Sequence, residues 1–77
     1  MTKTQYITEH PKSYLAHNLA NNNWTDNCQI EIVGGLDAPY TKQSNLYAAT
    51  DGGKKAYCIG GHRYRGTEGW WFAVKMN

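Results

Sequence analysis

The chain has 77 residues, with eight basic and six acidic side chains and a formal net charge of +2. A chain of this length forms one domain, residues 1–77, and buries only about 60% of the surface that its unfolded form exposes. No apolar run reaches the ~20 residues of a membrane helix, and the first six residues lack the apolar stretch of a signal peptide, so a soluble cytoplasmic protein is expected.

The charge is unevenly spread along the sequence. Residues 1–39 carry two basic and four acidic side chains, a net charge of −2, whereas residues 40–77 carry six basic and two acidic side chains, a net charge of +4. Such asymmetry favours a polar partner for the basic half. The alternative is a solvated surface of ordinary lysines.

The first third of the sequence predicts a short strand and then a helix. Residues 4–8 read as the strand, which His10-Pro11 ends. A helix over residues 11–21 follows, because proline suits the first helical position. Leu15 and Leu19 lie one helical turn apart and predict a narrow apolar stripe, and the run of asparagines after residue 20 should end the helix in a left-handed cap.

Residues 28–33 alternate between apolar and polar side chains and predict a strand that ends at Gly34-Gly35. Residues 36–42 read as a loop. Residues 43–50 fit either a helix that ends at Gly52-Gly53 or a strand over residues 45–50. We favour the strand, joined to residues 55–59 by a tight turn at Asp51-Gly52-Gly53, because an Asp-Gly pair accepts the positive φ angles that such a turn needs.

The end of the sequence predicts a second hairpin, formed by residues 63–65 and 70–76 around a turn at residues 66–69. In the last strand Trp70, Phe72 and Val74 should face the helix, and Trp71 should lie on the opposite face with Lys75. The expected fold class is therefore α+β, with one N-terminal helix packed on a four- to five-stranded antiparallel sheet.

The candidate binding residues lie in this last third of the chain, where basic and aromatic residues alternate with glycines. Arginine suits phosphate or carboxylate groups, and exposed rings stack on bases or on a partner's side chains. The alternative is that Tyr64 and Trp71 complete the core. The predicted partner-binding residues are Arg63, Tyr64, Arg65, Trp71, Lys54, Lys55 and Lys75.

Catalytic and metal sites find little support in the sequence. Cys58 and His62, with Cys28 and His17 or His10, offer ligand types for zinc, but a structural zinc site normally has two close ligand pairs and only one pair exists here. A cysteine–histidine nucleophile lacks any motif that fixes its geometry. We therefore predict no enzyme activity, no metal and no cofactor. The cysteines are expected to be buried free thiols, with a disulfide as the alternative.

These observations predict a small non-enzymatic protein that acts by occupying the surface of a macromolecular partner, either a protein or a nucleoprotein complex. Size and composition suggest a phage- or mobile-element-type inhibitor of a host nucleic-acid machine. The alternative is a domain that binds single-stranded nucleic acid directly with a basic-aromatic sheet face, which predicts strongly salt-dependent binding. The sequence leaves the oligomeric state open.

Overall fold

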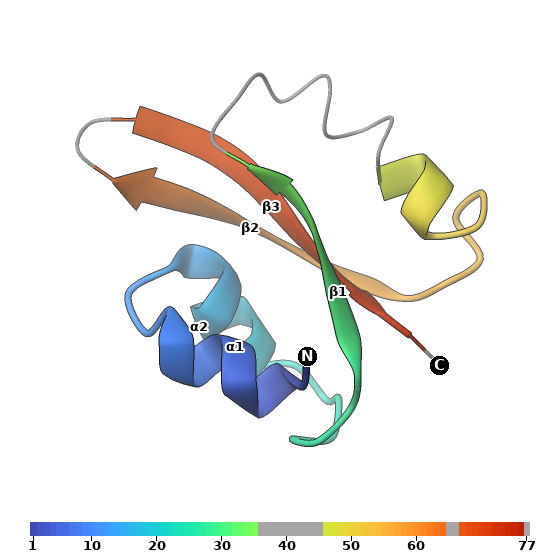
Figure 1. Ribbon diagram of the computed structural model, residues 1–77, viewed down its shortest axis with the longest axis horizontal. Helices are drawn as coiled ribbons and strands as arrows, with labels where there is room; N and C mark the ends of the chain where they lie inside the picture. Colours follow the sequence, from blue (N-terminus) through green and yellow to red (C-terminus); the bar gives the residue numbers. More distant parts are fainter. Residues whose placement is uncertain (36–45, 65–66, 77) are drawn as a thin grey trace.

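The computed structural model describes residues 1–35, 46–64 and 67–76, and of residues 35, 61–64 and 67–70 it describes the backbone alone. Its elements are α1 (Lys3–Glu9), α2 (Tyr14–Ala20), a short helix at residues 46–49, β1 (Ile30–Gly35), β2 (Tyr57–Tyr64) and β3 (Thr67–Lys75). Figure 1 shows α1 and α2 on one side of the strands and the short helix on the other in this view. The class is α+β, as expected.

Residues 4–8 form most of helix α1, so the predicted strand is wrong. Thr2 and Gln5 form a capping box: the Thr2 hydroxyl accepts a hydrogen bond from the Gln5 N–H (3.1 Å), and the Gln5 side chain accepts one from the Thr2 N–H (2.7 Å). These bonds satisfy N–H groups that have no partner within the helix. The helix also places Tyr6 inside the protein, with 2% of its surface exposed.

Helix α2 confirms the predicted helix over residues 14–20, but it begins three residues later than the predicted start at residue 11. Ser13 is its N-cap and accepts a hydrogen bond from the N–H of Ala16 (2.9 Å), so residues 11 and 12 form a turn before it. Leu15 and Leu19 are fully buried, as their spacing predicts. The helix ends at Asn21, which has right-handed geometry (φ −98°) instead of the expected left-handed cap.

The sheet has three antiparallel strands in the order β1-β3-β2, so the prediction of four or five strands is wrong. β1 confirms the predicted strand at residues 28–33, although it begins at Ile30 and continues through Gly34 and Gly35. β2 runs without a break through Gly60 and Gly61 and pairs with β3 along its whole length. The predicted strands at residues 55–59 and 63–65 are therefore one strand, β2, and residues 67–69, predicted as a turn, belong to β3.

Residues 46–49 are helical, and the predicted strand over residues 45–50 is wrong. The Leu46 carbonyl accepts the N–H of Thr50 (2.8 Å), which is a helical hydrogen bond. The predicted turn at residues 51–53 is present: Asp51, Gly52 and Gly53 all have positive φ angles, of 54°, 68° and 88°. It leads from a helix into β2, however, and does not join two paired strands. The predicted loop at residues 36–42 lies outside the described residues.

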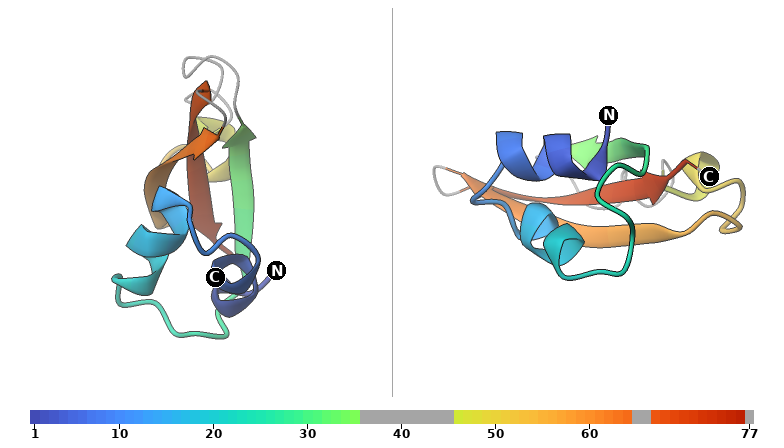
Figure 2. Two further views of the ribbon diagram at one scale, coloured as in Figure 1. Left: turned by 90° about the vertical axis from the view of Figure 1, so that its left-hand side faces the viewer. Right: turned by 90° about the horizontal axis from the view of Figure 1, so that it is seen from below.

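Both faces of the sheet carry apolar side chains, and the helices cover the face opposite to the predicted one. Ile30 and Ala73 pack with α1 and α2 in the larger core cluster. Phe72 and Val74 are buried on the other face with Val33, against side chains of the short helix. The predicted division of β3 side chains between the two faces was correct. Because both faces are apolar, however, the sequence gives no signal for which face a helix covers. Figure 2 shows α1 and α2 gathered on their side of the strands.

Helix α2 touches the backbone of β2 at Gly60. A Cβ atom at this position would lie 2.4 Å from the Cα and 2.6 Å from the N of Leu15. Such distances are too short for any side chain, so glycine at position 60 allows the helix to approach the strand closely. The sequence predicts separate strands at residues 55–59 and 63–65, with this glycine between them, whereas in the structure it is a packing position within one strand.

Candidate binding surface

Trp71 belongs to the core. It is partly buried and packs against the cluster beneath α1 and α2, so the expectation that its indole stands in water on an outer face is wrong. The reason is that α1 and α2 cover the face of the sheet opposite to the predicted one. Trp71 lies two residues before the buried Ala73 in β3, so both side chains project from the face that these helices cover. The structure thus favours the alternative in which Trp71 completes the core.

The other predicted anchors are only partly described. The backbone register places Arg63 opposite Glu68 and Tyr64 opposite Thr67, while the side chains of these four residues, and the whole of Arg65, lie outside the described part. Lys75 pairs with Ile30 in register, donates its backbone N–H to the Ala56 carbonyl (2.9 Å) and is half-buried. The structure therefore does not assemble the predicted set into one described surface.

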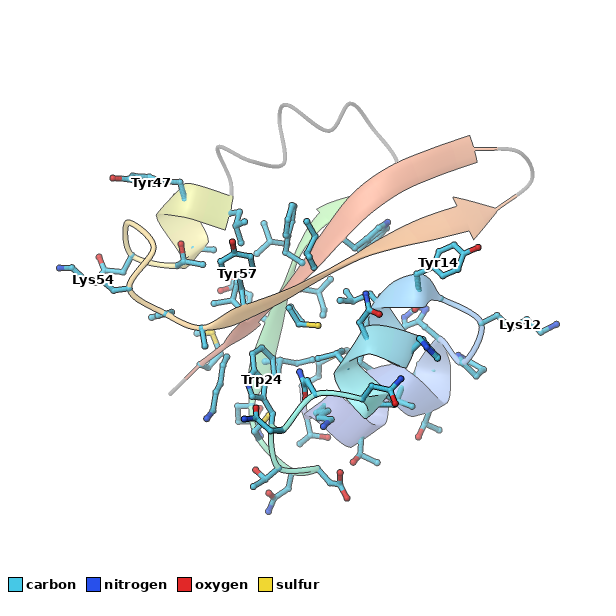
Figure 3. The ribbon with its side chains drawn as sticks, turned by 180° about the vertical axis from the view of Figure 1, so that it is seen from behind. Lys12, Tyr14, Trp24, Tyr47, Lys54 and Tyr57 are labelled. Atoms are coloured by element: carbon cyan, nitrogen blue, oxygen red, sulfur yellow. The ribbon has the colours of Figure 1, made fainter. Side chains whose placement is uncertain are left out.

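Lys54 and Lys55 are exposed, as expected for contact residues, and three apolar side chains of the flanking segments are exposed as well. Tyr47, Tyr57 and Ile59 have 68%, 50% and 46% of their surface exposed. We call these five residues the lysine–tyrosine surface. Figure 3 shows Tyr47 and Lys54 at one end of the molecule, Tyr57 nearer its middle, and Lys12 and Tyr14 at the other end.

The turn that carries the two lysines is held by hydrogen bonds to its own backbone. Thr50, of which 1% is exposed, lies at its centre. The Thr50 hydroxyl donates to the Leu46 carbonyl (2.8 Å) and accepts from the Gly53 N–H (3.1 Å), and the Thr50 carbonyl accepts from the Lys55 N–H (2.9 Å). These bonds order the turn before any ligand arrives, which reduces the entropy lost on binding.

The aromatic side chains of this surface rest on ordered neighbours. Tyr57 lies opposite Val74 in the sheet register and meets the ring of the buried Phe72 edge to face, with centroids 6.4 Å apart. The Tyr47 hydroxyl lies beside Gly52, where an added Cβ would be 3.5 Å from it. Each tyrosine thus has one side supported and another exposed, which suits it for contact with a partner.

Sequence reasoning missed the three apolar members of this surface. It assigned Tyr47 and Tyr57 to two strands of one hairpin and treated Ile59 as ordinary strand content. The sequence does contain a signal for Tyr57 and Ile59. Together with Cys58 they form a run of three apolar residues, so both faces of this strand are apolar and each face needs a cover. Tyr47 had no such signal, since only the helical turn at residues 46–49 directs it outward.

The outer edge of β2 lies beside this surface. The bond from the Lys75 N–H to the Ala56 carbonyl sets the alternation of hydrogen bonds, so in an antiparallel ladder the backbone groups of Tyr57 and Ile59 point away from β3. Consistent with this, the Ile59 carbonyl accepts a hydrogen bond from the Asn18 side chain (2.8 Å) of α2. Among the described residues, no hydrogen bond reaches the Tyr57 backbone or the Ile59 N–H.

A second polar cluster lies inside the protein, around Lys3. This side chain has 3% of its surface exposed and donates to the Asn22 side chain (2.9 Å) and to the Trp24 carbonyl (2.8 Å). Burial raises the pKa of the nearby Cys58 thiol, while a hydrogen bond from Asn22 and the charge of Lys3 act in the opposite direction. Lys3 thereby ties the loop after α2 to helix α1.

The two cysteines are free and half-buried. Among the side chains that the structure describes, no three from histidine, cysteine or acidic residues gather as a metal site would require. The described part of the chain has no helix of the length and apolarity that crossing a membrane demands. Comparison of the sequence with protein families and with characterised proteins, and of the fold with solved structures, finds no match.

Proposed function

We propose that this chain is a non-enzymatic binding protein, and that it occupies the surface of a macromolecular partner through the lysine–tyrosine surface. The observation that carries the proposal is the exposure of Tyr47, Tyr57 and Ile59 in the segments that flank Lys54 and Lys55, which lie on an ordered turn. Tyrosine supplies a large contact area at low entropic cost, and aromatic residues dominate the binding energy of many interfaces.

This surface lies at the opposite end of β2 from Arg63, Tyr64 and Arg65. β2 has eight residues, Tyr57–Tyr64, and a strand rises about 3.3 Å per residue, so roughly 20 Å separate its two ends. The binding role of the arginine end remains a prediction from sequence. The proposal rests on the lysine end, where the structure describes the side chains.

A protein partner fits the lysine–tyrosine surface better than a nucleic acid does. Two lysines neutralise few phosphates, whereas affinity for nucleic acid grows with each phosphate contact. Ile59, 46% exposed, offers apolar area without a ring for stacking. The lysines would increase the rate of association with an acidic partner. In this proposal the protein acts in the cytoplasm as an inhibitor, and a phage-type antagonist of a host nucleic-acid machine is the version that its size and composition suggest.

Affinity capture from the native host, with and without nuclease, tests the proposal. The informative variant is Tyr57→Ser, and the matched control is Tyr14→Ser on α2, because Tyr14 is 55% exposed and Tyr57 50%. A protein that is retained after nuclease treatment, lost with the first variant and kept with the second is the expected result. Equal retention by both variants would remove the lysine–tyrosine surface from the proposal.

Direct binding of single-stranded nucleic acid is the second candidate, because two exposed tyrosine rings beside two lysines also suit base stacking. An oligothymidylate titration at low salt tests it. Binding that weakens steeply with salt and is lost with Lys54→Ser, but not with Lys12→Ser, would favour this candidate over a protein partner. Both lysines are exposed, and they lie at opposite ends of the molecule (Figure 3).

A further inference from the structure

The structure also indicates how the partner is recognised. We propose that it presents an extended acidic segment, which adds as a further strand to the outer edge of β2 at Tyr57–Ile59 and places its carboxylates near Lys54 and Lys55. This inference rests on the proposed function, since it describes the partner of the same surface. Strand addition of this kind takes its affinity from main-chain hydrogen bonds and its specificity from alternate side chains.

The two edges of the sheet differ in how the described residues cover them. At the edge formed by β1, the Met1 carbonyl accepts the Ile30 N–H (2.8 Å), and Thr2 forms a bridge with Gln29, so the N-terminal residues cover the start of the strand. At the edge formed by β2, the backbone of Tyr57 and the N–H of Ile59 point outward and have no hydrogen-bond partner among the described residues. Uncovered edge groups of this kind favour pairing with another chain.

The side chains beside this edge define the chemistry of the segment. Tyr57 and Ile59 lie two residues apart in β2 and therefore project from the same face, half exposed. An added strand would place alternate apolar side chains next to them. Lys54 and Lys55 precede this stretch and are exposed, so opposite charge favours acidic residues at the corresponding end of the segment.

A second copy of this chain fits the edge poorly. Antiparallel pairing of two β2 strands would bring the lysine end of one copy toward the later half of the other, which carries Arg63 in its sequence. Like charges placed across a strand pair are destabilising. The charge pattern therefore favours a different, acidic chain as the occupant.

Asn18 limits how far the added strand can pair. Its side-chain amide donates to the Ile59 carbonyl (2.8 Å), which is the group that an N–H of the segment would use. The segment must displace this amide to extend its ladder beyond Ile59. Asn18→Ala should therefore leave the carbonyl open and tighten binding by about 2- to 10-fold, the range expected for one net hydrogen bond.

A titration of the isotopically labelled protein with synthetic peptides, followed by NMR, tests the inference. The probe is a blocked hexapeptide that alternates glutamate and valine, and the control peptide alternates lysine and valine. The expected result is that the acidic peptide shifts and protects the amides of Tyr57 and Ile59, more weakly at high salt, and that the basic peptide does not. Shifts located elsewhere, equal shifts with both peptides, no binding of the acidic peptide, or competition for the same amides by oligothymidylate alone would overturn it.

A backbone change separates this inference from the proposed function. Cys28 and Cys58 provide ligation junctions for total synthesis, so N-methyl-Ile59 can be introduced, with N-methyl-Asn23 in an exposed loop as the control. The modified edge should lose the acidic peptide and the captured partner while Tyr57 is unchanged. Retention of both by N-methyl-Ile59 would refute strand addition and leave the lysine–tyrosine surface intact as a binding site. If N-methyl-Ile59 does not fold, Asn18→Ala decides the question: unchanged or weaker peptide binding would count against the edge.

Discussion

Gly60→Ala is the sharpest test of the packing that positions β2 and its binding surface. The added methyl group would lie 2.4 Å, 2.6 Å and 2.9 Å from the Cα, N and Cβ atoms of Leu15, whereas ordinary contacts begin at 3.4 Å. Two of these three atoms are backbone atoms of α2, so no side-chain rotation can relieve the contact. The helix must move about 1 Å from the sheet, and overpacking of this kind costs roughly 1–3 kcal/mol.

The upper end of that range is expected here, because Leu15 and Leu19 of α2 are fully buried and move with the helix. A small domain without disulfides has a free energy of unfolding of about 3–5 kcal/mol. At about 4–8 °C per kcal/mol for this size, a loss of about 3 kcal/mol lowers the Tm by roughly 12–24 °C. The variant should therefore be largely unfolded near 37 °C.

Urea unfolding followed by circular dichroism and tryptophan fluorescence measures this loss. Gly53→Ala is the control: its added Cβ meets no atom within 4 Å, although its φ of +88° disfavours alanine. Both changes add one methyl group to a glycine, so the control should lose only about 1 kcal/mol from the backbone conformation. A Gly60→Ala protein with the urea midpoint of the wild type would show that α2 does not lie on β2 as described.

Three side-chain variants and one pH titration test the rest of the fold. Ser13→Ala removes the N-cap of α2 and should lower the free energy of unfolding by about 1 kcal/mol in urea titrations. Lys3→Met removes two hydrogen bonds to the loop after α2 and should lower it by about 1–3 kcal/mol. Thr50→Val leaves the Gly53 N–H in the turn without its acceptor and should cost about 1–2 kcal/mol and weaken partner binding. Burial raises the pKa of Cys58 above 9.0 and that of Tyr6 above 10.0, so the unfolded chain loses these two protons at lower pH than the folded protein does. The contribution of these two groups to the free energy of unfolding should therefore not change with pH below pH 9, and should fall above it.

Each of these expectations has a contrary result. A Ser13→Ala or Thr50→Val protein as stable as the wild type would argue against the corresponding hydrogen bonds. A Lys3→Met protein more stable than the wild type would mean that burial of the ammonium group costs more than its hydrogen bonds contribute. For the pH titration, Cys58→Ala should reduce the decline above pH 9, and an unchanged decline would assign it to other groups.

The fold could be predicted from the sequence where the apolar residues of an element repeat with one clear period, helical or extended. The spacing of Leu15 and Leu19 identified α2, and the alternation from Cys28 to Val33 identified β1. Helix α1 was missed because its signal is a capping pair at Thr2 and Gln5, and its apolar content, chiefly Tyr6, is too sparse to show a period. The short helix at residues 46–49 was taken for a strand, because an apolar run of this length fits either structure.

The candidate site was predictable only in part. The sequence placed Lys54 and Lys55 on a turn, and the structure describes them there as exposed. The sequence also predicted that the Trp71 side chain is exposed to solvent, and that prediction depended on which face of β3 the helices cover. Because Phe72 and Ala73 are both buried, each face of this strand is apolar and the pattern is the same for either choice.

The sequence alone thus determined features that depend on neighbours along the chain: the apolar stripe of α2, the alternation of β1 and the positive φ angles at residues 51–53. Tertiary structure decided which sheet face receives the helices, and on that face the missing side chain of Gly60 allows the backbone of α2 at Leu15 to approach β2 closely. It also decided that Tyr47 is exposed on a helical turn and that Tyr57 and Ile59 are exposed on one face of β2. These exposures depend on the packing of the short helix on the sheet and on the pairing of β2 with β3, which are interactions between segments distant in sequence.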